Sequence, residues 1–75
     1  MRQIVHVLRN PGGGWYVQLG GDERSTSVHR SQLEAIEEGR RLAKAEKAKL
    51  FIHGKDGQVR DRFNYDGSPH RSYAR

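Results

Sequence analysis

The sequence predicts an α+β domain, in which a small antiparallel sheet in the order β-β-(β)-α-β-β carries one helix on one face. Three observations predict this fold. Residues 31–47 have the period of an amphipathic helix, the segments on either side alternate with the period of strands, and turn residues join those segments in pairs. At 75 residues the chain suffices for one domain, but folding hides only about 60% of its surface, so the core must be thin.

The first strands are expected at residues 4–8 and 15–19. Asn10, Pro11 and Gly12 to Gly14 separate them, and such a cluster favours a hairpin. Residues 25–29 add a short third strand. Alternation leaves two registers open for the first strand, because Ile4 and Leu8 share a side with His6 while the neighbouring valines share the other.

The helix is expected to begin after Ser31, because Ser31 and Glu34 have the spacing of a capping box. Gly39 lies near the centre of its apolar stripe. Glycine weakens a helix by about 1 kcal/mol, so a close approach to the sheet is expected there. On the outer face Glu37 is expected to pair with Arg41. The apolar stripe consists of Ala35, Ile36, Gly39, Leu42 and Ala43.

Two more strands are expected at residues 50–53 and 58–65, joined by the turn 54–57. Asp56 and Gly57 supply the positive dihedral angles of a tight hairpin turn. From Asp66 onward periodicity ends, which predicts one domain over residues 1–65 and a flexible basic tail over residues 66–75.

Alternation assigns the strand residues to the two faces of the sheet. The face toward the helix is expected to carry Trp15, Val17, Leu19, Leu50, Ile52, Val59 and Phe63. The opposite face is expected to carry Tyr16, Gln18, Phe51, His53, Arg60 and Arg62. One helix cannot cover both faces, so the second set is expected to face solvent.

Several segments resemble the bacterial family catalogued as domain of unknown function 2188. They are Gly14-Trp15, Ser27-Val28-His29, Glu34-Ala35-Ile36 and, most specifically, the stretch from His53 to Arg62. The resemblance covers about residues 5–69 and implies the topology given above. Residues 64–67, Asn-Tyr-Asp-Gly, depart from the Ser-Tyr-Gly turn usual there. The family's role is not established, so the resemblance implies no site residue.

Composition argues against secretion and membrane insertion. The chain has no cysteine and 33% hydrophobic residues, and no apolar run approaches the roughly 20 residues of a transmembrane helix. Gln3, His6 and Arg9 interrupt the apolar residues at the N-terminus, unlike a signal peptide. A soluble cytoplasmic protein without a membrane partner is therefore expected.

Neither a metal site nor an enzyme active site is expected. The four histidines, His6, His29, His53 and His70, form no closely spaced ligand pair. The glycine clusters lack the Lys-Ser or Lys-Thr of a phosphate-binding loop, and no hydroxyl group stands out as an activated nucleophile. We expect no cofactor, no small-molecule substrate and no catalytic activity.

The charge distribution favours an acidic partner. The net charge is +5, whereas residues 31–47 contain four basic and four acidic residues, so the excess lies in the strands and the tail. The leading expectation is low-specificity binding of DNA or RNA, since rings and guanidinium groups stack on bases and neutralise phosphates. The expected binding residues are Tyr16, Phe51, His53, Arg60, Arg62 and, in the tail, Arg71.

Two other interpretations of the same face remain open. Tyr16 and Phe51 could be an ordinary cross-strand pair, with the arginines only keeping an exposed sheet soluble. Alternatively, the face or an edge strand binds another protein or a second copy of the chain.

Overall fold

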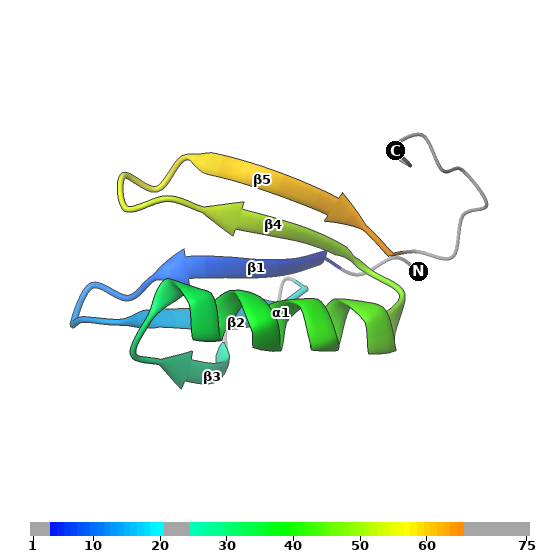
Figure 1. The fold of residues 1–75 in the computed structure, drawn as a ribbon, viewed down its shortest axis with the longest axis horizontal. Helices are drawn as coiled ribbons and strands as arrows, with labels where there is room; N and C mark the ends of the chain where they lie inside the picture. The colour runs from blue at the N-terminus through cyan, green and yellow to red at the C-terminus, as the bar shows by residue number, and fades with distance from the viewer. Residues whose placement is uncertain (1–3, 21–24, 66–75) are drawn as a thin grey trace.

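The computed structural model describes residues 4–20 and 25–65, which form one helix and a five-stranded sheet. The α+β class predicted from the sequence is confirmed. The strands lie side by side in the order β3-β2-β1-β4-β5, with α1 across one face (Figure 1). The elements are β1 (Ile4–Arg9), β2 (Trp15–Leu19), β3 (Ser25–His29), α1 (Gln32–Glu46), β4 (Lys49–His53) and β5 (Val59–Asn64).

The sheet is mixed, and the expectation of a purely antiparallel sheet was wrong. β1 and β4 pair in parallel, with Val5 opposite Leu50 and Val7 opposite Ile52. The other three strand pairs are antiparallel. The parallel pairing results from the crossover connection from β3 through α1 to β4. β2 already occupies one edge of β1. After β3 the chain returns along α1, so β4 joins the remaining edge of β1 in the direction of β1.

The helix begins and ends with specific caps. The Oγ of Ser31 accepts a hydrogen bond from the Glu34 amide at 3.2 Å, which confirms the predicted N-cap. At the other end Lys47 takes the left-handed conformation, with φ 53° and ψ 50°. Arg41 bonds to Glu38 instead of the expected Glu37, with Nε to Oε1 at 3.0 Å. Within residues 4–20 and 25–65, no helix is long and apolar enough to cross a membrane.

The core lies between α1 and the middle strands. Val5, Val7, Val17 and Leu50 are its largest fully buried side chains, so the core is thin, as the chain length indicated. The valines of β1 therefore face α1, which resolves the register that alternation had left open. Trp15, Ala35, Ala43, Ala48 and Ile52 complete the buried set.

Gly39 is where the helix approaches the sheet most closely. A Cβ atom at this position would lie 2.8 Å from Cγ2 of Val7 and 3.2 Å from Cδ1 of Leu50. Both neighbours are fully buried side chains. The close approach predicted from the apolar stripe is therefore confirmed.

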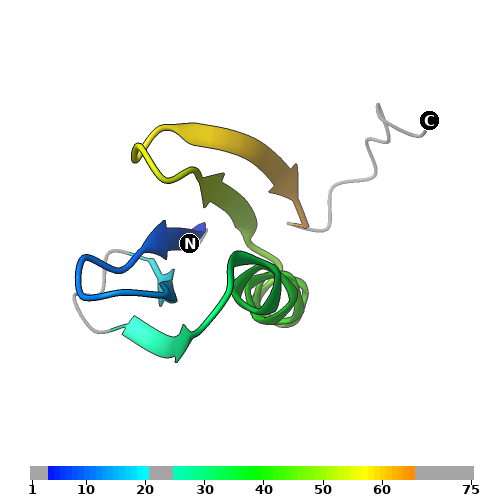
Figure 2. The same cartoon turned by 60° about the vertical axis from the view of Figure 1, so that its left-hand side comes forward.

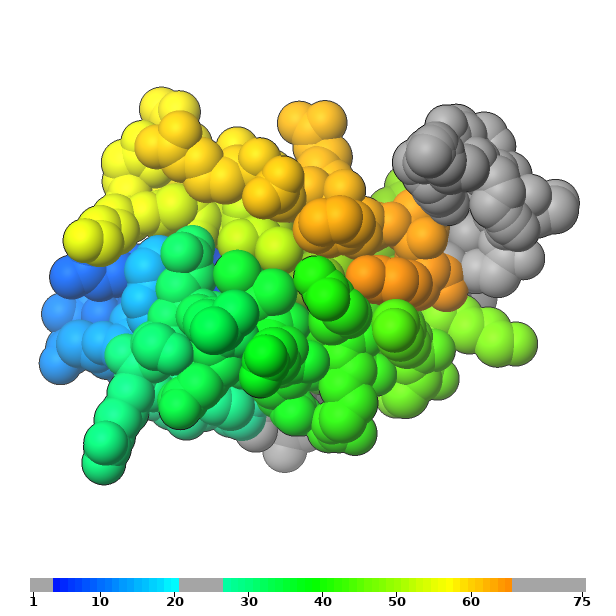
Figure 3. Space-filling view, in the orientation of Figure 1, coloured from blue at the N-terminus to red at the C-terminus, as the bar shows by residue number. Residues whose placement is uncertain are grey.

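β5 lies beside the helix and not beneath it, as the space-filling view shows (Figure 3). Val59 and Phe63 were expected in the core, yet 37% and 38% of their surfaces are exposed. For Phe63 the reason is that one helix covers only β1 to β4. Val59 lies opposite His53, on the side of the sheet away from α1, because the strand register shifts between Ile52 and His53. Cations of α1 cover the rings instead, since Cζ of Arg40 lies 5.8 Å from the centre of the Phe63 ring and Nζ of Lys44 lies 5.8 Å from that of Tyr65.

Candidate functional site

The side of the sheet away from α1 has no covering element among the described residues (Figure 2). We call it the open face. Strand register determines its members, because residues directly opposite each other in neighbouring strands point to the same side. They are Ile4, His6 and Leu8 of β1, Tyr16 and Gln18 of β2, Val28 of β3, Lys49, Phe51 and His53 of β4, and Val59, Arg62 and Asn64 of β5.

None of these open-face residues carries a carboxylate. Asp61, the one acidic residue in the described strands, is opposite buried Ile52 and therefore points to the helix side. Asp56 lies in the turn between β4 and β5. The glutamates at positions 34, 37, 38 and 46 belong to α1. The charged side chains that residues 4–20 and 25–65 place on the open face are thus all basic.

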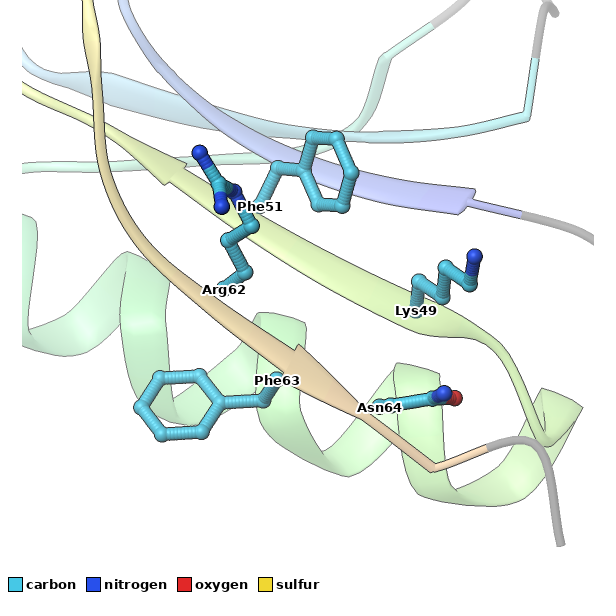
Figure 4. Close-up of a pocket in the computed structure, with 5 residues that line it drawn as sticks. All are labelled: Lys49, Phe51, Arg62, Phe63 and Asn64. Atoms are coloured by element: carbon cyan, nitrogen blue, oxygen red, sulfur yellow. The ribbon is translucent and has the colours of Figure 1, made fainter. Parts of the chain in front are cut away.

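A shallow depression of about 250 Å³ lies at the open face of the β4–β5 hairpin. Two cross-strand pairs, Lys49 with Asn64 and Phe51 with Arg62, surround it, and Phe63 contributes from β5. Figure 4 shows Phe51 and Arg62 on the same side of the hairpin, with the ring of Phe63 pointing the other way. The depression therefore combines one aromatic ring with two cations.

The basic residues near the depression differ in their partners. Arg60 forms an ion pair with Asp56, with Nη2 to Oδ2 at 3.3 Å, and packs against Gly54. Neither Lys49 nor Arg62 has an acidic partner within the described ranges. The charges of Lys49 and Arg62 are therefore available to a bound anion, whereas that of Arg60 is already partly neutralised.

Two histidines form a hydrogen-bonded pair on the open face. His53 Nδ1 lies 3.1 Å from the Gly57 carbonyl oxygen, which only accepts, so this nitrogen carries a proton. His53 Nε2 then accepts a hydrogen bond from His6 Nδ1 at 3.1 Å. The His6 ring also contacts Phe51 edge to face, with ring centres 5.6 Å apart. The pair joins β1 to β4 and holds the ring of Phe51 in place.

This environment favours neutral His6. Burial lowers the pKa of His6 below its usual value, and the nearby His53 lowers that pKa further. Burial disfavours the charged form of His6 by removing water from it, and a positive charge on His53 would disfavour it by repulsion.

A second histidine contact lies on the helix side of β3, where Ser27 Oγ is 2.8 Å from His29 Nε2. A serine nucleophile needs its imidazole to be oriented by a third group. The nearby carboxylate of Glu38 instead accepts two hydrogen bonds from Arg41. Residues 4–20 and 25–65 also contain no group of three side chains that could hold a metal ion. The open face is therefore the stronger candidate site.

The structure brings together most of the residues expected from the sequence. Phe51, His53 and Arg62 lie on neighbouring strands, while Tyr16 lies two strands away, beside Leu8. Arg71 lies outside the described residues.

Sequence reasoning missed Lys49 and His6. Lys49 lies on the same face as Phe51, two residues before it. Its position was not predicted because the strand was expected to begin at Leu50. His6 was missed because its position depended on the unresolved register of β1.

Comparison with known proteins identifies the family but no function. No curated protein and no solved structure is significantly similar to this chain. Residues 5–65 match the family described as "Uncharacterized protein conserved in bacteria (DUF2188)". Because the match covers the sheet and the helix, the chain belongs to DUF2188, a bacterial family of uncharacterised proteins.

Proposed function

We propose that this protein is a small non-catalytic module that binds nucleic acid with low sequence preference through its open face. The observation that carries the proposal is the charge of this face, where Lys49 and Arg62 flank Phe51 and none of the face's described residues carries a carboxylate. Neutralising phosphates supplies most of the affinity in non-specific nucleic-acid binding. Aromatic rings on a sheet add stacking that tolerates any base.

The geometry also indicates which residues contribute. Arg62 and Lys49 would contact phosphates, and Phe51 and Tyr16 would contact bases. Arg60 would contribute less, because its ion pair with Asp56 must be weakened before it can neutralise a phosphate. His53 would act indirectly, by holding His6 against Phe51.

Fluorescence anisotropy with a labelled 15-nucleotide strand at about 50 mM salt tests the proposal. Arg62→Glu should weaken binding by about tenfold or more, because it replaces attraction to phosphate by repulsion. The matched control is Arg41→Glu, which makes the same change in net charge on an exposed helix residue. The control should bind nearly as well as the parent.

Salt dependence provides a second measurement. Each phosphate contact contributes about −0.7 to the slope of log K against log salt for a single strand. Removing Lys49 and Arg62 together should therefore reduce the magnitude of the slope by about 1.4. Absence of binding by the parent at low salt, or equal loss in Arg41→Glu, would contradict an interface on the open face.

A further inference from the structure

We propose that the depression between β4 and β5 is a stacking site for one unpaired base, so that the ligand is single-stranded nucleic acid. This inference rests on the proposed function and names the class of nucleic acid. The base would lie against Phe51, and Arg62 and Lys49 would contact the adjoining phosphates.

The size of the depression indicates that it holds one planar group, and that this group belongs to a longer polymer. Its volume of about 250 Å³ lies below the roughly 300–1,000 Å³ of typical small-molecule pockets. A single planar ring fits a shallow site of this kind, yet gains little affinity there. A polymer that repeats the same group along a charged backbone gains affinity from several such contacts.

The open face has a second ring that suits a neighbouring base. Tyr16 lies on β2, separated from Phe51 on β4 by β1. Two strand spacings place these rings on the order of 10 Å apart. They are too far apart to enclose one base between them, so each ring would contact a different base of the same strand.

The width of the sheet argues against a duplex. Five strands at spacings of about 4.8 Å make a face about 19 Å across. The major groove of B-DNA is about 12 Å wide and admits a helix or a two-stranded ribbon. The open face is therefore too wide to enter the major groove, and an undistorted stacked duplex offers no base plane to Phe51.

The ring of Phe51 is also held in position without a ligand. It is held edge to face by His6, which the hydrogen bond to His53 keeps in place. A ring that is already ordered loses little conformational entropy on binding.

The test compares four probes of equal length: a dT 15-mer, an rU 15-mer, a dT·dA duplex and a 15-mer of abasic sites, which has the same phosphates but no bases. We expect the dT and rU strands to bind at least about tenfold more tightly than the duplex and the abasic strand. Phe51→Leu should weaken dT binding about 5- to 100-fold and leave abasic binding unchanged. Phe51→Tyr should restore dT binding, which keeps the test valid if Phe51→Leu folds poorly.

The outcomes separate this inference from the proposed function. Equal binding of the dT and abasic strands would show that only phosphates are recognised, which overturns the stacking site and leaves nucleic-acid binding intact. Tighter binding of the duplex would overturn the single-strand assignment in the same way. If no probe binds, both proposals fail, and a dimeric mass in sedimentation would then favour association between two copies of the chain.

Discussion

At the residue scale, the pKa of His6 links the open face to stability. Because burial and His53 lower this pKa in the folded protein, the unfolded chain binds more protons once the pH falls below about 6.5. The free energy of unfolding should therefore decrease as the pH falls from about 7.5 to 5.5, a range in which carboxylates of ordinary pKa remain ionised.

Urea unfolding of the parent and of His6→Gln across this pH range measures the effect. Glutamine does not titrate, so the variant should show a flatter dependence on pH. An NMR titration of the His6 ring provides the direct check, and a midpoint at or above 6.5 would refute the prediction.

Gly39 gives a second prediction at the same scale. In an exposed helix position Gly→Ala would stabilise the helix by about 1 kcal/mol. Here the new Cβ would lie 2.8 Å from Val7, and overpacking costs typically 1 to 3 kcal/mol. Gly39→Ala should therefore lower the melting temperature slightly, and Gly39→Leu should lower it further. A melting temperature at or above the parent's in both variants would contradict the close approach of α1 to the sheet.

At the scale of elements, the C-terminus of α1 carries a conformational cost that substitution can remove. Lys47 is the one described non-glycine residue with positive φ, a conformation that glycine adopts without hindrance. Lys47→Gly should raise the free energy of unfolding by about 0.5 to 1 kcal/mol. Lys47→Ala loses the same charge but keeps Cβ, so it should bring no such gain. Equal stabilisation by both variants would assign the effect to charge.

The hairpin of β4 and β5 shows what local sequence signals could predict. Asp56-Gly57 correctly located the turn, in which Gly57 donates to the Gly54 carbonyl at 3.0 Å. Of its residues only Gly57 has positive φ, at 86°, and the register shifts between Ile52 and His53. The hairpin therefore has the expected tight turn, but with one positive φ instead of two and with an additional register shift in the strands. Alternation assigned Arg62 and Phe63 to the correct faces of β5 but not Val59, which the register shift places opposite His53 on the open face. It could not predict the exposure of Phe63, which depends on how far one helix reaches.

At the scale of the whole molecule, local patterns predicted the elements and the two hairpins, but not how the hairpins join. The parallel pairing of β1 with β4 follows from the path of the chain around the core, and no periodicity within either strand encodes it. For the same reason, part of the candidate site could not be predicted from the sequence. His6 and Phe51 meet only across this pairing, so their contact could not be anticipated while the register of β1 was open.

A chain ending after Tyr65 tests the predicted division into domain and tail. The Tyr65 amide donates to the Ala48 carbonyl at 3.0 Å, so this variant keeps every described contact. Its melting temperature should match the parent's. It loses Arg71 and Arg75, and binding to a single strand should weaken with a salt slope smaller by up to about 1.4. Complete loss of binding would place the interface in residues 66–75 and not on the open face.

The parallel seam between β1 and β4 also has a kinetic consequence. Each hairpin closes a short loop, whereas His6 and His53 are separated by 47 residues. Contacts between distant residues are slow to form, because the entropy of closing the chain is lost before the contacts stabilise it. We therefore expect the two hairpins to form early and independently. Their union along the seam, with α1 closing over Val5 and Val7, is then expected to limit the folding rate.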